Sequence, residues 1–253
     1  MKWIHFTGLR GGLSSAGGEE LMNAIASNES QSVGRPNEAA EDDESRDDEA
    51  YQAILLRIIR GEWAGGSELK TTHLARELGL SRTPVRQALA ALAADGIIER
   101  KKNQRAIVRP GAENWLVQIH ELRLLLEPHA AAHAAQQMPE AALDALDLLA
   151  QAAAPQADSD WMQAARQFDY ALHLAIAEHA GNLPLRESIR KCWSYKRLSY
   201  EAGADKPSAL ERGYREHLAI LAALRSRRPQ TAEAAMAHHL HSAVHSRPDE
   251  RIV

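Results

Sequence analysis

Apolar residues recur at helical spacing along much of the chain, and the first such stretch is compact. Ile54, Leu55 and Ile58 share one helical face, which ends before Gly61. The same spacing, bounded by glycines, predicts two further helices, and two short β-prone pieces joined by a basic turn follow them. We therefore expect a winged helix-turn-helix with three helices and a small β-hairpin wing. Its expected elements are a helix from about 51, helices at about 71–78 and 82–94, and strands at 97–99 and 106–108.

Beyond Pro110 the chain is rich in Ala and Leu and shows no convincing β-prone run. Prolines and glycines interrupt a series of amphipathic segments, which predicts an all-helical antiparallel bundle. The fold class as a whole is therefore expected to be mainly α. The six helices expected in the bundle are about 113–136, 139–151, 159–180, 183–200, 208–225 and 230–245.

The expected helix at 82–94 has two chemically different sides. Val85, Ala88 and Leu89 fall on one apolar stripe, whereas the opposite side is polar and carries two arginines one turn apart. Arginines near the N-terminus of such a helix are suited to guanine edges in the major groove. An ordinary exposed face is the alternative, but the preceding turn and the basic wing favour DNA reading. The candidate DNA-binding residues are Arg82, Thr83, Arg86 and Gln87 on the helix and Lys101 and Lys102 in the wing.

The net charge of −4 is distributed unevenly along the chain. Residues 1–50 carry a net charge of −7, residues 51–110 carry +6, and residues 111–253 carry −3. A compact basic block between acidic neighbours is typical of a nucleic-acid-binding module. The charge pattern therefore agrees with the prediction made from the apolar positions.

The first 47 residues lack sustained apolar periodicity and end in an acidic run, a composition that predicts a disordered tail. The single cysteine, Cys192, excludes an intramolecular disulfide, and no apolar run approaches the roughly 18 residues of a membrane span. We therefore expect a cytoplasmic protein. Its expected parts are an acidic tail at 1–47, the winged helix-turn-helix at 48–110, a helical effector-binding domain at 111–247 and a tail at 248–253.

Ten of the twelve histidines lie in the helical region beyond Pro110. Lone histidines on helices are more often core or surface residues than ligands, so their position within each helix must discriminate. His238, His241 and His245 recur on a polar stripe and are expected to be exposed. One carboxylate and three imidazoles fall instead on apolar stripes of three helices, and such a set suits Zn²⁺, Ni²⁺ or a similar divalent ion. These candidate metal ligands are Asp169, His173, His217 and His239.

Arg123 lies on an apolar stripe with Ile119, and a buried arginine needs an anionic partner. Two partners are open at this point: Glu127, one turn further along the helix, or the carboxylate of a small ligand. Trp193 and Arg197, one turn apart on the fourth helix of the bundle, are further candidates for a ligand-binding pocket.

Three segments of the basic module resemble the signature of the GntR family of transcription regulators. They are residues 61–66 (GEWAGG), 74–89 (LARELGLSRTPVRQAL) and 92–98 (LAADGII). The resemblance implies that Arg82, Thr83 and Arg86 contact operator bases or phosphates. Gly65 departs from the family pattern, because proline is usual there, and the wing has Asn103-Gln104-Arg105-Ala106 in place of its usual glycine.

Four segments of the helical region resemble the FCD domain of the FadR subfamily, with six helices as in its VanR-like subgroup. The resemblance implies that Asp169, His173, His217 and His239 hold a divalent ion and that Arg123 binds ligand acids. The segments are 121–128 (ELRLLLEP), 168–173 (FDYALH), 216–224 (EHLAILAAL) and 235–240 (AMAHHL).

These features predict a metabolite-responsive transcription regulator, expected to be a repressor and not an enzyme. One recognition helix reads too few base pairs for genomic specificity, so we expect a homodimer on a short inverted repeat. The expected effector is a small carboxylic acid bound with the help of the metal ion. A regulator that senses the metal ion itself is the first alternative, and a mononuclear metalloenzyme that activates water is the second.

Overall fold

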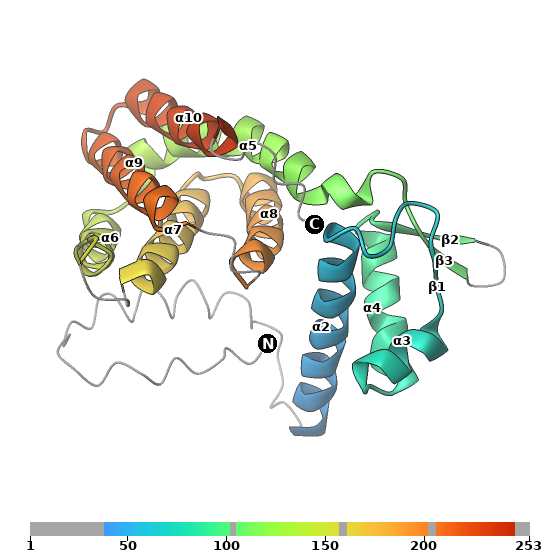
Figure 1. Ribbon diagram of the computed structural model, residues 1–253. Helices are drawn as coiled ribbons and strands as arrows, with labels where there is room; N and C mark the ends of the chain where they lie inside the picture. The colour runs from blue at the N-terminus through green and yellow to red at the C-terminus, as the bar shows by residue number, and fades with distance from the viewer. Residues whose placement is uncertain (1–37, 102–104, 157–160, 202–205, 246–253) are drawn as a thin grey trace. The chain divides into compact units, whose positions relative to one another are not determined.

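The computed structural model describes residues 38–101, 105–156, 161–201 and 206–245. They form two compact units, of which the first reaches Gln118 and the second begins at Ile119 (Figure 1). Among these residues, no helix has the length and hydropathy needed to cross a membrane. The expected mainly α fold is confirmed.

The first unit is a winged helix-turn-helix. Gly79 ends α3 in the left-handed conformation with φ +67°, and the short turn to Ser81 leads into α4. Both helices have the bounds that the sequence predicts. The elements of this unit are α2 (Glu38–Ile59), β1 (Glu68–Leu69), α3 (Thr71–Leu78), α4 (Arg82–Ala94), β2 (Ile98–Lys101) and β3 (Arg105–Val108).

The wing contains three strands where the sequence predicts two. β3 lies between β1 and β2, and both pairings are antiparallel. Glu68 pairs with Ile107, and Ile98 pairs with Val108. β1 was missed because two residues are too few to show an alternating pattern. Residues 102–104, and with them the candidate Lys102, lie outside the described residues.

The helix α2 corrects the expected boundary of the acidic tail. It begins at Glu38, so residues 38–47 are helical and not disordered as predicted. The segment Glu38-Ala-Ala-Glu41 is rich in good helix formers, and acidic side chains are favourable in the first turns of a helix. Residues 1–37 and 248–253, the rest of the two expected tails, lie outside the described residues.

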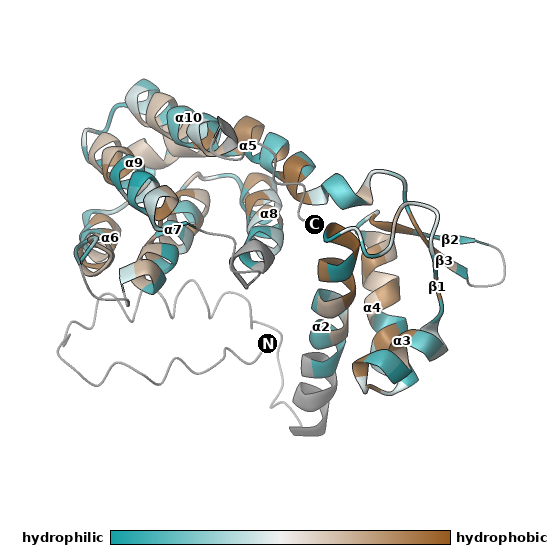
Figure 2. Cartoon of the chain, viewed as in Figure 1, coloured by the Kyte–Doolittle hydropathy of each residue, from teal (hydrophilic) through white to brown (hydrophobic). Residues whose placement is uncertain are grey.

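The core of the first unit lies between α2 and α4. Ile54, Leu55 and Ile58 are fully buried on α2, and Val85 and Leu92 are fully buried on α4. Figure 2 shows hydrophobic stretches in brown on both α2 and α4, and the two helices pack against each other. Burying a large aliphatic side chain contributes roughly 1.5–3 kcal/mol to the stability of the fold. Packing against α2 therefore holds α4 in place, while the polar side of α4 remains exposed.

The second unit is a helical bundle in which α7 contacts α6, α8 and α9 (Figure 1). Phe168, Leu172 and Ile176 are buried on α7. Each helix begins and ends within two residues of its predicted bounds. After a short 3₁₀ helix η1 (Ala112–Asn114), the helices are α5 (Trp115–Gln137), α6 (Glu140–Ala152), α7 (Trp161–Glu178), α8 (Leu183–Glu201), α9 (Pro207–Arg225) and α10 (Pro229–His245).

Gly65 occupies a position where no side chain fits. A Cβ atom on Gly65 would lie 2.7 Å from the Cα atom of Pro110, which is backbone and cannot rotate away. The next residues tie this loop to the wing, because Gly66 N–H donates to Val108 O at 2.8 Å. The close approach of the loop to Pro110 gives a physical reason for the departure from the family's usual proline.

We expect Gly65→Ala to destabilise the winged unit by roughly 1–3 kcal/mol, as an overpacked site does. Gly213→Ala is the matched control, because its Cβ atom would meet the His217 ring at an ordinary 3.8 Å within α9. Replacing a helical glycine by alanine stabilises by roughly 0.5–1 kcal/mol. Urea unfolding of both variants tests this, and equal stability of Gly65→Ala and the wild type would contradict the close contact.

Candidate functional site

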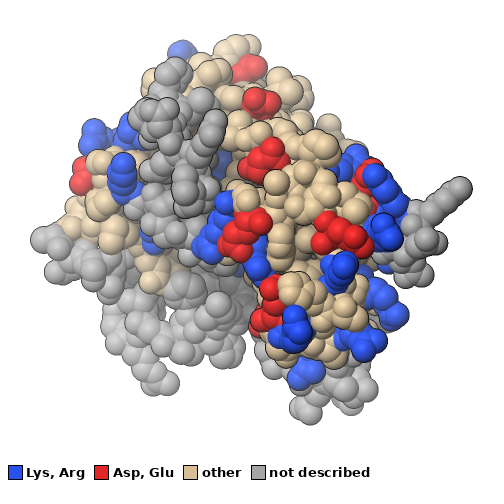
Figure 3. Space-filling model, turned by 45° about the vertical axis from the view of Figure 1, so that its right-hand side comes forward, with Lys and Arg blue, Asp and Glu red and all other residues tan. Residues whose placement is uncertain are grey.

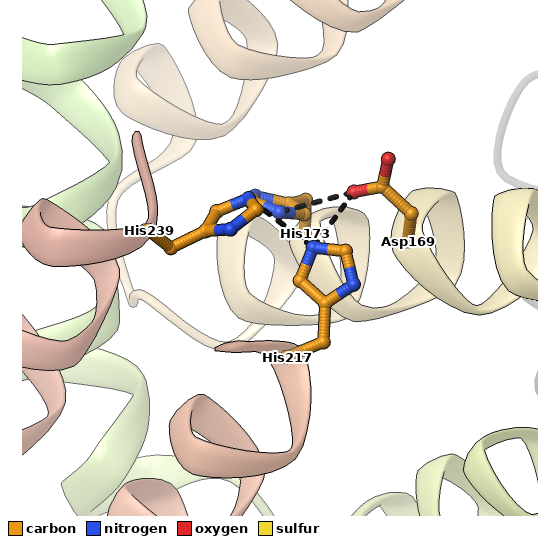
Figure 4. A group of neighbouring side chains, drawn as sticks. All are labelled: Asp169, His173, His217 and His239. Carbon is orange, nitrogen blue, oxygen red and sulfur yellow. Dashed lines mark hydrogen bonds and ion pairs between the residues drawn. The ribbon is translucent and has the colours of Figure 1, made fainter. Parts of the chain in front are cut away.

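Four side chains from three helices of the second unit converge in its interior (Figure 4). Asp169 and His173 come from α7, His217 from α9 and His239 from α10, and one nitrogen or oxygen atom of each lies within 4.8 Å of the others. The three histidine residues are at most 8 % exposed. These are the four residues that the sequence singles out as metal ligands.

Three pairs of facing atoms in this cluster lie close together. Asp169 Oδ1 lies 3.3 Å from His173 Nε2 and 3.2 Å from His217 Nε2. His217 Nε2 and His239 Nε2 are 3.1 Å apart. Neighbouring ligands of a tetrahedral zinc ion with bonds of about 2.0 Å lie about 3.3 Å apart, so these three pairs have the spacing that a bound ion requires.

Two of the rings are oriented by carboxylates on their far side. His173 Nδ1 donates to Glu127 Oε2, and His239 Nδ1 donates to Glu216 Oε2 at 2.8 Å. A neutral imidazole that carries its proton on Nδ1 has a lone pair on Nε2, where a metal would bind. His173 Nε2 is buried, and although Asp169 Oδ1 lies 3.3 Å away, it makes no well-aligned hydrogen bond among the described residues; a metal ion would satisfy this atom.

The charges of the site suit a cation. Burial raises the pKa of Asp169, but His217 and His173 together lower it well below its usual value. Burial and the nearby His217 lower the pKa of His239 to about 3, so this ring is neutral at pH 7. Burial also lowers the pKa of His173, but Glu127 and Asp169 outweigh it and raise the pKa, so an ion would take the place of a proton on this ring.

Glu127 connects this cluster to the predicted ligand-binding arginine. Its Oε1 accepts from Arg123 Nε at 2.5 Å and from Trp193 Nε1 at 3.1 Å. The Arg123 guanidinium also lies over the Trp193 ring, 4.3 Å from the ring centroid. Of the two partners considered for Arg123, the structure therefore shows Glu127. Burial raises the pKa of Glu127, but Arg123 and His173 bring it down to about 2.

The remaining pocket candidate, Arg197, lies beside Tyr170, an aromatic residue that contacts Trp193. Its guanidinium is 5.7 Å from the centroid of the Tyr170 ring, and that ring is 5.8 Å from the Trp193 ring.

Next to Trp193 on α8, the thiol of Cys192 is buried, and burial together with the charge of Glu127 raises its pKa to about 11.

Sequence reasoning missed Glu216 and the link between Glu127 and His173. Glu216 directly precedes the ligand candidate His217, and its position in the sequence carries no signal that it contacts His239 on another helix. Glu127 was identified only as a partner of Arg123, because a contact over 46 residues does not appear in helical periodicity.

The polar side of α4 is exposed as the sequence predicts. Arg82, Thr83, Arg86 and Gln87 are exposed, whereas Pro84 and Val85 between them are buried. Lys101 in β2 is also exposed and pairs with Glu99 at 3.1 Å. Lys and Arg side chains gather over this unit, at the lower right of Figure 3. Such a surface suits the phosphates and base edges of DNA.

Two family profiles match the chain, and together they cover about three quarters of it. Residues 46–108 match "Bacterial regulatory proteins, gntR family", and residues 118–242 match the FCD domain. Within the second match lie all four members of the buried cluster. Both profiles agree with the resemblance seen in the sequence motifs.

Relatives and solved structures give the same result. The chain is 29 % identical to the HTH-type transcriptional regulator LutR of Bacillus subtilis over 214 residues, which are 72 % of this chain and 92 % of that protein. It is 26 % identical to the putative L-lactate dehydrogenase operon regulatory protein of Escherichia coli, over 79 % of this chain and 84 % of the relative.

Among solved structures, Escherichia coli McbR/YncC aligns with a TM-score of 0.55 at 23 % identity, over 79 % of this chain and 96 % of the other, which shows a shared fold. The winged helix-turn-helix, the helical bundle and both profile matches therefore lead to one conclusion. The chain is a transcription regulator of the GntR family with a C-terminal FCD domain.

Proposed function

We propose that this regulator is a repressor whose FCD domain binds a divalent metal ion and a small carboxylic acid. The observation that carries the proposal is the buried cluster of Asp169, His173, His217 and His239, in which two rings are oriented by carboxylates. The family consists of DNA-binding regulators, which argues against the metalloenzyme alternative.

The exposed side of α4 supports operator reading. Arg82 and Arg86 are one turn apart at the N-terminal end of α4, which is the end that enters the major groove in helix-turn-helix proteins. The fork of an arginine matches the O6 and N7 acceptors of guanine. Because one such helix reads few base pairs, we propose that two copies of the chain bind a short inverted repeat.

The ion would be held by Asp169 Oδ1 and by Nε2 of His173, His217 and His239. Three imidazoles and one carboxylate are ligands that zinc and nickel accept, and we propose one of these as the native metal. When bound, the ion supplies a positive Lewis-acid centre for an oxygen of the effector. The chain itself contributes the orientation of the rings and a dry environment in which charge interactions are strong.

Arg123 supports a carboxylic acid as the effector. Arg123 is 3 % exposed, and its guanidinium donates a hydrogen bond to the carboxylate of Glu127 next to the metal cluster. An arginine guanidinium presents several N–H donors in a planar fork, and this geometry suits the carboxylate of a ligand. One relative is the putative L-lactate dehydrogenase operon regulatory protein of Escherichia coli, so we propose small hydroxy acids such as L-lactate as the first candidates.

A metal-ion sensor is the alternative to a metabolite sensor. The two differ in what changes operator affinity, because a metal sensor responds to zinc or nickel without any acid. A metabolite sensor responds to the acid only when it is loaded with metal. Operator titrations with each component alone and with both therefore separate the two functions.

We expect Arg86→Ala to lose roughly 1–3 kcal/mol of specific operator affinity, since a bidentate base contact is removed. Arg215→Ala is the matched control, because Arg215 is an exposed arginine on α9 of the other unit. Mobility-shift titrations at one salt concentration measure both. Wild-type affinity of Arg86→Ala would contradict the role of α4.

Adjacent histidines on α10 provide a sharp test of the metal centre. His239 is buried in the cluster, whereas His238 is exposed. We expect His239→Ala to lose zinc or nickel and His238→Ala to keep one ion per chain, as measured by elemental analysis. His129 and His133 on α5 are also exposed, with ring centroids 4.6 Å apart, and such a pair can bind a second ion. Both variants are therefore also made in a His133→Ala background, which removes this pair. One ion per chain in the His239→Ala protein of that background would count against the centre.

A panel of carboxylic acids tests the effector on metal-loaded protein. A ligand present at a hundred times its Kd stabilises the folded chain by about 2.7 kcal/mol, which a thermal shift detects. We expect the acid that stabilises the wild type to stabilise Arg123→Lys less, since lysine keeps the charge beside Glu127 but loses the planar fork. Equal stabilisation of both proteins would remove Arg123 from the binding site.

A further inference from the structure

Two glutamates lie directly behind the metal cluster, and each accepts a hydrogen bond from one candidate ligand. Glu127 on α5 accepts from His173 Nδ1, and Glu216 on α9 accepts from His239 Nδ1. In both rings the other nitrogen, Nε2, faces the cluster. The same arrangement therefore occurs twice, with the carboxylates supplied by different helices.

Each glutamate is itself held in place by further donors. The buried Glu127 accepts from Arg123 and Trp193 through Oε1, which leaves Oε2 for His173. The partly buried Glu216 accepts from the Ser242 hydroxyl through Oε1 at 2.6 Å, which leaves Oε2 for His239. Neither carboxylate can move toward or away from its ring without breaking a second interaction.

This arrangement selects one tautomer of each ring. A neutral imidazole carries its proton on either nitrogen, and a proton on Nε2 would occupy the position of the metal. A carboxylate beside Nδ1 keeps the proton there and makes Nε2 the basic atom. It also opposes rotation of the ring about its Cβ–Cγ bond, since a flipped ring would present carbon to the carboxylate.

We propose that Glu127 and Glu216 are positioning residues that set the metal affinity of this protein through His173 and His239, respectively. The inference rests on the proposed metal centre and adds to it two residues that do not touch the ion. Glutamine is the informative replacement, because it keeps the size of glutamate but offers one acceptor oxygen in place of two. In Glu127→Gln that oxygen cannot serve both His173 and the Arg123–Trp193 pair.

The test measures zinc affinity by competition with a chelating dye. We expect Glu127→Gln and Glu216→Gln each to bind zinc about 10–100-fold more weakly than the wild type. Glu178→Gln is the matched control, because Glu178 on α7 pairs with Arg186 at 2.9 Å and not with a member of the cluster. We expect its zinc affinity to equal that of the wild type.

A second readout separates positioning from a general effect on folding. In the zinc-loaded wild type, nuclear magnetic resonance should show His173 and His239 with their ring protons on Nδ1. Glu127→Gln should change the resonance of the Nδ1 proton of His173 and leave the resonance of the His239 ring proton unchanged. Glu216→Gln should change the resonance of His239 and leave that of His173 unchanged. Ring protons on Nε2 in the wild type would overturn the inference, and this measurement needs no variant to fold.

The outcomes distinguish this inference from the proposed function. Zinc bound equally tightly by the wild type and both variants would overturn the positioning role and leave the metal centre intact. Failure of the wild type to bind zinc or nickel would overturn the metal centre and the inference together.

Discussion

A charged carboxylate in the interior of the bundle constrains much of the second unit. Removing such a group from water costs several kcal/mol unless donors surround it. Glu127 on α5 meets this requirement with Arg123 from its own helix, His173 from α7 and Trp193 from α8. These three helices must therefore keep their positions relative to one another, or the carboxylate is left without partners. The candidate metal centre thus adjoins a buried polar network that already fixes one of its rings.

The metal cluster also depends on ordinary apolar packing. The ring of Phe168 lies edge-on to that of His217, with centroids 5.8 Å apart, and Phe168 is fully buried. On α10, Met236 and Leu240 flank His239 and are buried as well. Since each ligand candidate lies on the apolar stripe of its helix, the packing that closes the core brings the four polar side chains together. A change in core volume would consequently alter the geometry of the cluster.

Much of the fold and the four members of the candidate site could be predicted from the sequence, because the signals for them lie within single helices and turns. The bounds of α3 and α4 followed from Gly79, Ser81 and the Asp95-Gly96 pair, and the four cluster residues followed from their place on apolar stripes. β1 was too short to show a period, and helix formation at 38–47 was obscured by the acidic composition. The contacts of Glu127 with His173 and of Glu216 with His239 depend on how helices cross, which no single helix encodes.

The buried thiol of Cys192 has a consequence for the signals that this protein can sense. The thiolate is the reactive form of cysteine, and a pKa of about 11 keeps this side chain protonated at neutral pH. As the chain has no other cysteine, thiol-directed reagents find no thiolate in it at neutral pH. Toward thiol chemistry the regulator behaves as a cysteine-free protein. A cysteine introduced at an exposed position could therefore carry a spectroscopic label at a single defined place.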